Sequence, residues 1–143
     1  GLLAAKTFYD KGNVAAAKAA LAWVADKAFD EGYQAIAKLR LAAVLMDAKA
    51  YDDALKQLGG TFPPEFAPLV ADRMGDIDLL QGKKAEAAAQ YLKAYKSFGA
   101  SSQYRALVEV KLNALGVDPQ AGAASPAAAV AAADSASAAG DKK

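Results

Sequence analysis

Residues 75–91, GDIDLLQGKKAEAAAQY, carry the pattern that decides the fold. A small residue, Gly75, is followed twelve positions later by a second small residue, Ala87, and four positions after that by the large Tyr91. The pattern occurs in two further stretches, AAVLMDAKAYDDALKQL (residues 42–58) and AKTFYDKGNVAAAKAAL (residues 5–21). Small residues where two helices cross let the backbones approach, and a large residue fills the space beside the crossing. Each stretch therefore predicts a pair of crossed helices.

The spacing of the three stretches predicts the architecture. Their second small residues, Ala17, Ala54 and Ala87, are 37 and 33 positions apart, which brackets the period of about 34 residues of tetratricopeptide repeats. We expect an all-α, tetratricopeptide-like right-handed solenoid of about three helical hairpins with a C-terminal capping helix. The expected helices are residues 1–11, 14–29, 33–48, 51–58, 65–81, 84–97 and 102–115.

Glycines mark two of the hairpin turns. Gly12 and Gly82 follow the first helices of their hairpins, and glycine adopts the left-handed conformation that ends a helix. The middle hairpin has Lys49 there, which is a weaker stop signal. Asp78 stands where the repeat usually has a large apolar residue, so we expect the adjacent Leu79 and Leu80 to take over its packing.

Composition divides the chain in two. Residues 1–116 carry the periodic apolar residues and are the expected repeat domain. Residues 117–143 are rich in Ala, Gly and Ser and lack the aromatic and leucine content that folding requires, so we expect a disordered tail there.

The residue inventory argues against catalysis. The 143 residues include no His and no Cys, which removes the commonest general base and the commonest soft metal ligands. Asp72, Asp76 and Asp78 lie close together, but Arg73 stands among them, so an ion-paired or solvated helix face is the expected reading. We expect no enzyme activity, no cofactor and no metal site.

Charge and aromatic content point to protein partners. The 17 Lys and Arg against 16 Asp and Glu form no basic stripe, so nucleic acid is not an expected partner. Most aromatic residues fall at helical spacing, and we expect them to pack in the core or between repeats. They are Phe8, Tyr9, Trp23, Phe29, Tyr33, Tyr91, Tyr95 and Tyr104, with Tyr9 expected on the concave face instead.

Several runs resemble one bacterial family. They are AKLRLA (37–42), YDDALKQL (51–58), LVADRMGD (69–76), QGK (81–83) and KLNAL (111–115). Together they resemble the YfgM-like family, whose members are ancillary subunits of the SecYEG translocon, and the resemblance covers residues 1 to about 116. The tail lies outside it.

The resemblance implies a function and a location. Family members have one transmembrane helix near the N-terminus and a repeat domain on the periplasmic side of the inner membrane. Their partners are translocon subunits and a membrane-anchored periplasmic chaperone of the prolyl-isomerase type. The anchor is absent from this sequence, so the resemblance implies membrane attachment only through a preceding segment. The alternative is a cytoplasmic regulatory scaffold with the same fold.

The repeat register predicts a partner-binding groove on the concave face, formed by the first helices of the hairpins. Arg40 and Arg73 are 33 residues apart and occupy equivalent places in it. A groove that mixes charged with a few apolar side chains suits a peptide or a partner's helix. Its candidate residues are Lys6, Tyr9, Asp10, Arg40, Ala43, Met46, Asp47, Arg73, Asp76 and Leu80. Because residues 1–9 begin a helix without its preceding part, we also expect self-association there.

Overall fold

The computed structural model describes residues 1–120, in which every regular element is helical. The elements are α1 (Leu2–Asp10), α2 (Val14–Lys27), α3 (Glu31–Asp47), α4 (Tyr51–Leu58), the 3₁₀ turn η1 (Pro64–Phe66), α5 (Ala67–Leu80), α6 (Lys84–Ser97) and α7 (Gln103–Ala114). The predicted all-α repeat fold is confirmed, with boundaries shifted by a few residues. Both boundaries between α2 and α3 differ by two residues from the prediction, because Ala28 is extended and Asp30 caps α3 by accepting two backbone N–H groups.

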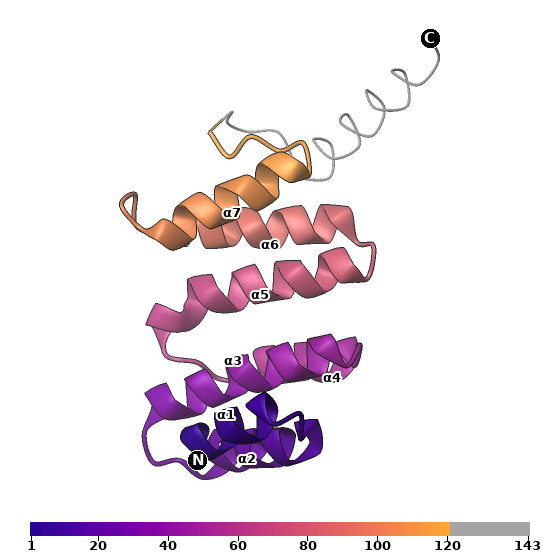
Figure 1. The fold of residues 1–143 in the computed structure, drawn as a ribbon. Coiled ribbons are helices and arrows are strands. Elements are labelled where there is room, and N and C mark those ends of the chain that lie inside the picture. Colours follow the sequence, from indigo (N-terminus) through magenta and orange to yellow (C-terminus); the bar gives the residue numbers. More distant parts are fainter. Residues whose placement is uncertain (121–143) are drawn as a thin grey trace. The chain divides into compact units, whose positions relative to one another are not determined.

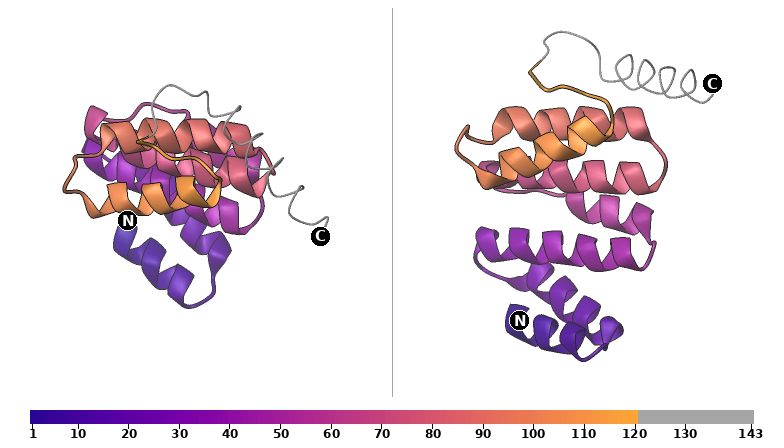
Figure 2. Two further views of the ribbon diagram at one scale, coloured as in Figure 1. Left: turned by 90° about the horizontal axis from the view of Figure 1, so that it is seen from above. Right: turned by 45° about the horizontal axis from the view of Figure 1, so that its top comes forward.

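The helices form two compact units. Residues 1–66 form unit 1, which contains the hairpins α1–α2 and α3–α4, with α2 also packed against α3. Unit 2 begins at Ala67 and contains the hairpin α5–α6 and the single helix α7, which packs against α6. Figure 1 shows the hairpins, and Figure 2 shows α7 against α6 from two further sides.

The three hairpin turns share one geometry. Gly12 and Gly82 have φ of 75° and 77°, and Lys49 adopts the same left-handed region with φ 59°. In each turn the next residue donates its backbone N–H to a carbonyl five positions earlier, at 2.8 Å. The weak stop predicted at Lys49 is therefore a full helix stop of the same kind, because the backbone hydrogen bonds of the turn hold it in place.

The end of α7 repeats this turn without a fourth hairpin. Gly116 has φ 76°, and Val117 donates to the Leu112 carbonyl at 2.9 Å. However, Glu109 stands at the position where the register places Ala5, Ala42 and Gly75. A second helix could not cross closely over a glutamate side chain. The sequence of α7 thus suits the capping role that was predicted for it.

The core contains the predicted pairs of one small and one large residue at the helix crossings. Ala17, Ala54 and Ala87 are completely buried, and the large partners Leu58 and Tyr91 are buried beside them. In unit 2 the core gathers around Tyr91, which packs directly against Gly75. The hairpins are therefore held by close backbone crossings, in the places where the sequence pattern put them.

Two packing expectations were wrong. Asp78 is only 9% exposed, whereas Leu79 and Leu80 are exposed, so the leucines do not replace it. The apolar residue of this stretch that is completely buried is Ile77 instead. Most of the aromatic residues expected in the core were also misjudged: Tyr91 and Tyr95 are buried, while Phe8, Trp23, Phe29, Tyr33 and Tyr104 are exposed. Tyr9, which was expected outside the core, is exposed.

The region after α7 remains folded for a short distance. Val117, which the sequence analysis placed at the start of the tail, is buried in the core of unit 2. The rest of the predicted disordered tail, from residue 121 onward, lies outside the described residues. Among residues 1–120, none of the helices has both the length and the apolar character needed to cross a membrane.

Candidate partner-binding site

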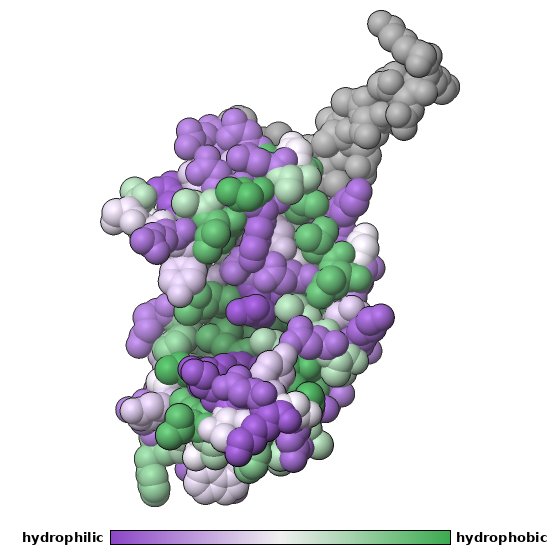
Figure 3. Space-filling view, in the orientation of Figure 1, coloured by the Kyte–Doolittle hydropathy of each residue, from purple (hydrophilic) through white to green (hydrophobic). Residues whose placement is uncertain are grey.

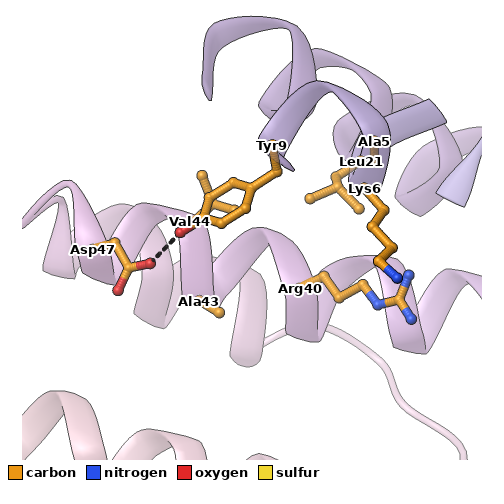
Figure 4. Close-up of a pocket in the computed structure, with 8 residues that line it drawn as sticks. All are labelled: Ala5, Lys6, Tyr9, Leu21, Arg40, Ala43, Val44 and Asp47. Carbon is orange, nitrogen blue, oxygen red and sulfur yellow. Dashed lines mark hydrogen bonds between the residues drawn. The ribbon is translucent and has the colours of Figure 1, made fainter. Parts of the chain in front are cut away.

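A pocket of about 370 Å³ opens between α1 and α3 of unit 1 (Figure 4). Five of the predicted groove residues line it: Lys6, Tyr9, Arg40, Ala43 and Asp47. Three residues that the sequence analysis did not select, Ala5, Leu21 and Val44, complete its wall. The pocket therefore contains five of the ten predicted groove residues, and its apolar wall comes from residues that the register did not select.

The floor of the pocket is apolar and rigid. Ala5, Leu21 and Val44 are all buried, on three different helices. Ala5 and Leu21 are the small and large residues of the first repeat pattern, so the packing that builds the hairpin also builds the floor. Ala43 has a small side chain, which leaves space above this floor. An apolar surface beside charged groups can bury one apolar side chain of a bound segment.

One end of the pocket is positively charged. Lys6 on α1 and Arg40 on α3 extend next to each other there (Figure 4). Both are exposed, and within residues 1–120 neither takes part in an ion pair. Two adjacent unpaired cations raise the local concentration of anions and favour a carboxylate on a ligand.

The opposite end of the pocket is fixed by a hydrogen bond. Tyr9 donates its hydroxyl to Asp47 Oδ2 at 2.8 Å, and this bond connects α1 to α3 (Figure 4). The hydrogen bond, and then the negative charge of Asp47, raise the pKa of the Tyr9 hydroxyl above its ordinary value. The tyrosine therefore stays a neutral donor at physiological pH. The pocket has a cationic end and an end where a neutral tyrosine hydroxyl is bonded to the negatively charged Asp47, with an apolar floor between them.

The remaining predicted groove residues lie elsewhere. Asp10 and Met46 belong to α1 and α3 but do not line the pocket, and Arg73, Asp76 and Leu80 belong to α5 of unit 2. The acidic residues of α5 already have internal partners. Lys111 Nζ on α7 lies 2.8 Å from Asp72 and 2.9 Å from Asp76, so the predicted ion-paired helix face is present.

The charged side chains between α5 and α7 are paired with one another. Asp76 also accepts a hydrogen bond from the Tyr91 hydroxyl at 2.7 Å, and Arg73 lies 4.0 Å from it. Burial alone would lower the pKa of Lys111, but its bonds to the two carboxylates outweigh burial and raise it. Burial and the bond to Asp76 raise the pKa of Tyr91 far above its ordinary value. These groups keep their protons at neutral pH and connect the capping helix to α5.

The polar groups of the pocket are few, and the described residues contain no metal-ligand cluster. Within residues 1–120, no group of three or more His, Cys, Asp or Glu side chains could hold a metal ion. The groups at the pocket are a lysine, an arginine, a tyrosine and an aspartate that is already bonded to that tyrosine. This arrangement can bind a ligand through charge and apolar contact.

Comparisons with known proteins agree with the repeat architecture. A family model described as a tetratricopeptide repeat-like domain matches residues 1–117. A curated relative, "Ancillary SecYEG translocon subunit" from Neisseria gonorrhoeae, is 36% identical over 114 residues, which is 80% of this chain. Those residues are 54% of the relative, so the chain spans about half the length of the protein that it matches. No solved structure matches the chain.

Proposed function

Because the chain belongs to the YfgM-like family of tetratricopeptide repeat-like proteins, we propose that it is a non-catalytic binding module of an ancillary translocon subunit. The relative's name supplies the translocon, and the repeat fold supplies the mode of action, since stacked helical hairpins present extended surfaces to other proteins. The module acts by holding partner proteins close to the translocon.

The observation that carries this proposal is the pocket between α1 and α3. It combines an apolar floor with Lys6 and Arg40, which form no ion pair among the described residues. The matching ligand is a protein segment with an apolar side chain next to a carboxylate. The apolar side chain would contact Leu21 and Val44, and the carboxylate would lie between the two cations. Exposed charges of this kind mainly increase the association rate, so binding should weaken as salt concentration rises.

The finer parts of the proposal concern location and partners. We place the module on the periplasmic side of the bacterial inner membrane, attached through an N-terminal segment of the full-length protein. Its partners are translocon subunits and a membrane-anchored chaperone of the prolyl-isomerase type. Protease added to spheroplasts tests the location: digestion of the module in intact spheroplasts supports the periplasm, while protection would favour a cytoplasmic scaffold.

Site-specific cross-linking tests the pocket itself. A photoreactive residue at Ala43, inside the pocket, should capture translocon subunits or the chaperone in the full-length protein in membranes. The matched control is the same residue at Ala89, which is exposed on α6 of unit 2. Mass spectrometry would identify the captured proteins. Equal capture from the two positions would contradict the assignment of the pocket.

Charge reversal tests the two cations. The double variant Lys6→Glu/Arg40→Glu should lose most of the Ala43 capture without unfolding, because exposed charges contribute only about 0–1 kcal/mol to stability. The control variant Lys93→Glu/Lys96→Glu makes the same change in net charge at two exposed positions of α6. If both variants keep full capture, the cationic end has no role in binding.

A further inference from the structure

The pocket between α1 and α3 has ends of opposite charge. Lys6 and Arg40 stand at one end, and Asp47 stands at the other, bonded to Tyr9. In Figure 4 Lys6 lies beside Arg40 and Tyr9 beside Asp47, so α1 and α3 both run from the cationic to the anionic end. Arg40 and Asp47 are seven positions apart on α3, which corresponds to about 10 Å, or about two helical turns.

The ends of the two helices strengthen this asymmetry. α1 ends at Asp10 and α3 ends at Asp47, and neither helix has a basic residue in its last turn. The C-terminus of a helix carries a partial negative charge, because its last carbonyl groups lack helical partners. Lys11 and Lys49 follow these helix ends but do not line the pocket. The helix dipoles and the carboxylates therefore make the same end of the pocket negative.

The pocket favours a helix over an extended segment as its ligand. The floor residues Ala5, Leu21 and Val44 are apolar and lie within helices, so the floor offers no partner for the backbone N–H and C=O groups of a ligand. An extended segment would leave these groups unpaired there, whereas a helix pairs them internally. Over α1 and α3, Figure 3 shows strongly hydrophilic side chains beside hydrophobic ones, which suits an amphipathic helix.

We infer that the partner segment is a short helix of about two turns that binds in one direction, antiparallel to α1 and α3. Its C-terminal end lies at Lys6 and Arg40, which neutralise the negative end of its dipole and a carboxylate of its last turn. Its N-terminal end lies at Asp47, whose Oδ1 accepts no hydrogen bond from the described residues and can take a free backbone N–H. The inference rests on the proposed function, because it specifies the segment that occupies the same pocket.

Two helical peptides that differ only in the position of their charges test the direction. Both have about ten residues, a central Leu, acetylated and amidated ends and the same hydrocarbon staple, but one carries two Glu residues in its last turn and the other in its first. Fluorescence anisotropy at low salt measures their binding to the full chain. The peptide with Glu in its last turn should bind at least about fivefold more tightly, because the other peptide brings either its carboxylates or its carbonyl end to Asp47.

Variants of the chain locate the bound peptide. Lys6→Glu/Arg40→Glu should remove the preference between the two peptides, because it removes the cationic end. The matched control Lys93→Glu/Lys96→Glu, at exposed positions of α6, should keep it. Circular dichroism confirms that each variant is folded before its binding is compared.

The chain contains no Cys, so a single introduced Cys reads the direction of the bound peptide. Leu3 and Asp10 are exposed and lie seven positions apart on one face of α1, beyond Lys6 and Tyr9 respectively. The tighter peptide carries a bromoacetyl group at its N-terminus, and the Cys thiolate displaces the bromide to form a thioether. At saturating peptide, Asp10→Cys should react at least about fivefold faster than Leu3→Cys, after each rate is divided by the rate with free bromoacetamide.

Three results would overturn the inference. Equal affinity of the two peptides, or faster reaction at Leu3→Cys, would contradict the direction. Failure of both peptides to bind would contradict a short helix with an acidic end as the ligand. None of these results decides the proposed function, which fails instead if photoreactive residues at Ala43 and Ala89 capture partners equally in membranes.

Discussion

Adding one methyl group at Gly75 tests the crossing that holds unit 2 together. A Cβ at this position would lie 2.6 Å from Cε1 and 2.7 Å from Cδ1 of Tyr91. Carbon atoms in contact normally lie about 3.5–4.0 Å apart, so the methyl group and the ring would overlap by roughly 1 Å. The ring has little room to move, because Tyr91 is completely buried and its hydroxyl is bonded to Asp76.

The magnitude follows from two opposing effects. Overpacking a core costs about 1–3 kcal/mol, whereas replacing glycine by alanine inside a helix gains about 1 kcal/mol. Because Tyr91 is completely buried and its hydroxyl is bonded to Asp76, we expect the upper half of the overpacking range. Gly75→Ala should therefore lower the free energy of unfolding by about 1–2 kcal/mol.

Unit 1 provides the matched comparison. There the equivalent pairs are Ala5 with Leu21 and Ala42 with Leu58. In these pairs alanine stands in place of Gly75, and leucine stands in place of the larger Tyr91. In a Tyr91→Leu background, Gly75→Ala recreates this pair. The overlap is then gone and only the gain in helix propensity remains, so the same substitution should stabilise by up to about 1 kcal/mol. The effect of Gly75→Ala is thus expected to change sign between the two backgrounds.

Urea denaturation followed by far-UV circular dichroism measures all four proteins of this cycle. Dichroism is needed because the single tryptophan, Trp23, lies in unit 1 and reports on the wrong hairpin. If Gly75→Ala changes stability by the same amount with Tyr91 and with Leu at position 91, the two positions are uncoupled and the crossing does not depend on their contact.

Two further predictions concern charges in unit 2. Burial raises the pKa of Asp78 above its ordinary 3.8, so the folded state is favoured below that value and loses stability as pH rises through the raised pKa. Asp78→Asn should therefore come closest to the wild type at the lowest pH and exceed its unfolding free energy by an amount that grows as pH rises through the raised pKa, and parallel curves of unfolding free energy against pH would contradict a titrating Asp78. Lys111→Met should cost about 1–2 kcal/mol, less than a fully buried pair because Lys111 is partly exposed. Adding Asp72→Asn should recover part of that loss in thermal melts, and no recovery would show that the ion pairs do not connect α7 to α5.

The sequence alone predicted the helices well because their signals are local. Gly12 and Gly82 ended helices where expected, and the small residues at the crossings were buried. These positions depend on backbone conformation and on side-chain volume, which a repeat preserves from one hairpin to the next. Even the exception, Lys49, followed the same turn, because the hydrogen bonds of the turn outweigh the modest cost of a left-handed lysine.

The candidate pocket and the ion pairs of unit 2 are formed by residues far apart in the sequence, which a local sequence pattern does not bring together. The floor of the pocket combines Leu21 of α2 with Val44 of α3, and Lys111 lies 35 residues from its partner Asp76. Most of the predictions that aromatic residues would be buried were wrong for a related reason. Apolar periodicity identifies which face of a helix is apolar, but it does not show whether another element covers that face. At the end of unit 1, none of the described residues covers Trp23 or Phe29.

Equivalent register positions serve different purposes in the two units. In unit 1, Lys6 and Arg40 are unpaired among the described residues and flank an open pocket. In unit 2 the residue at the register position of Lys6 is Asp76, which is bonded to Lys111 and Tyr91 and lies near Arg73. Because Asp76 already interacts with three internal groups, it is poorly available to bind a partner. Asp76 also partly neutralises the charge of Arg73. The repeat register therefore determines the position of a side chain on its helix. Contacts with residues distant in the sequence determine whether that side chain is available to bind a partner. For this reason Lys6 and Arg40, rather than Arg73, are the cations that should determine the salt dependence of partner binding.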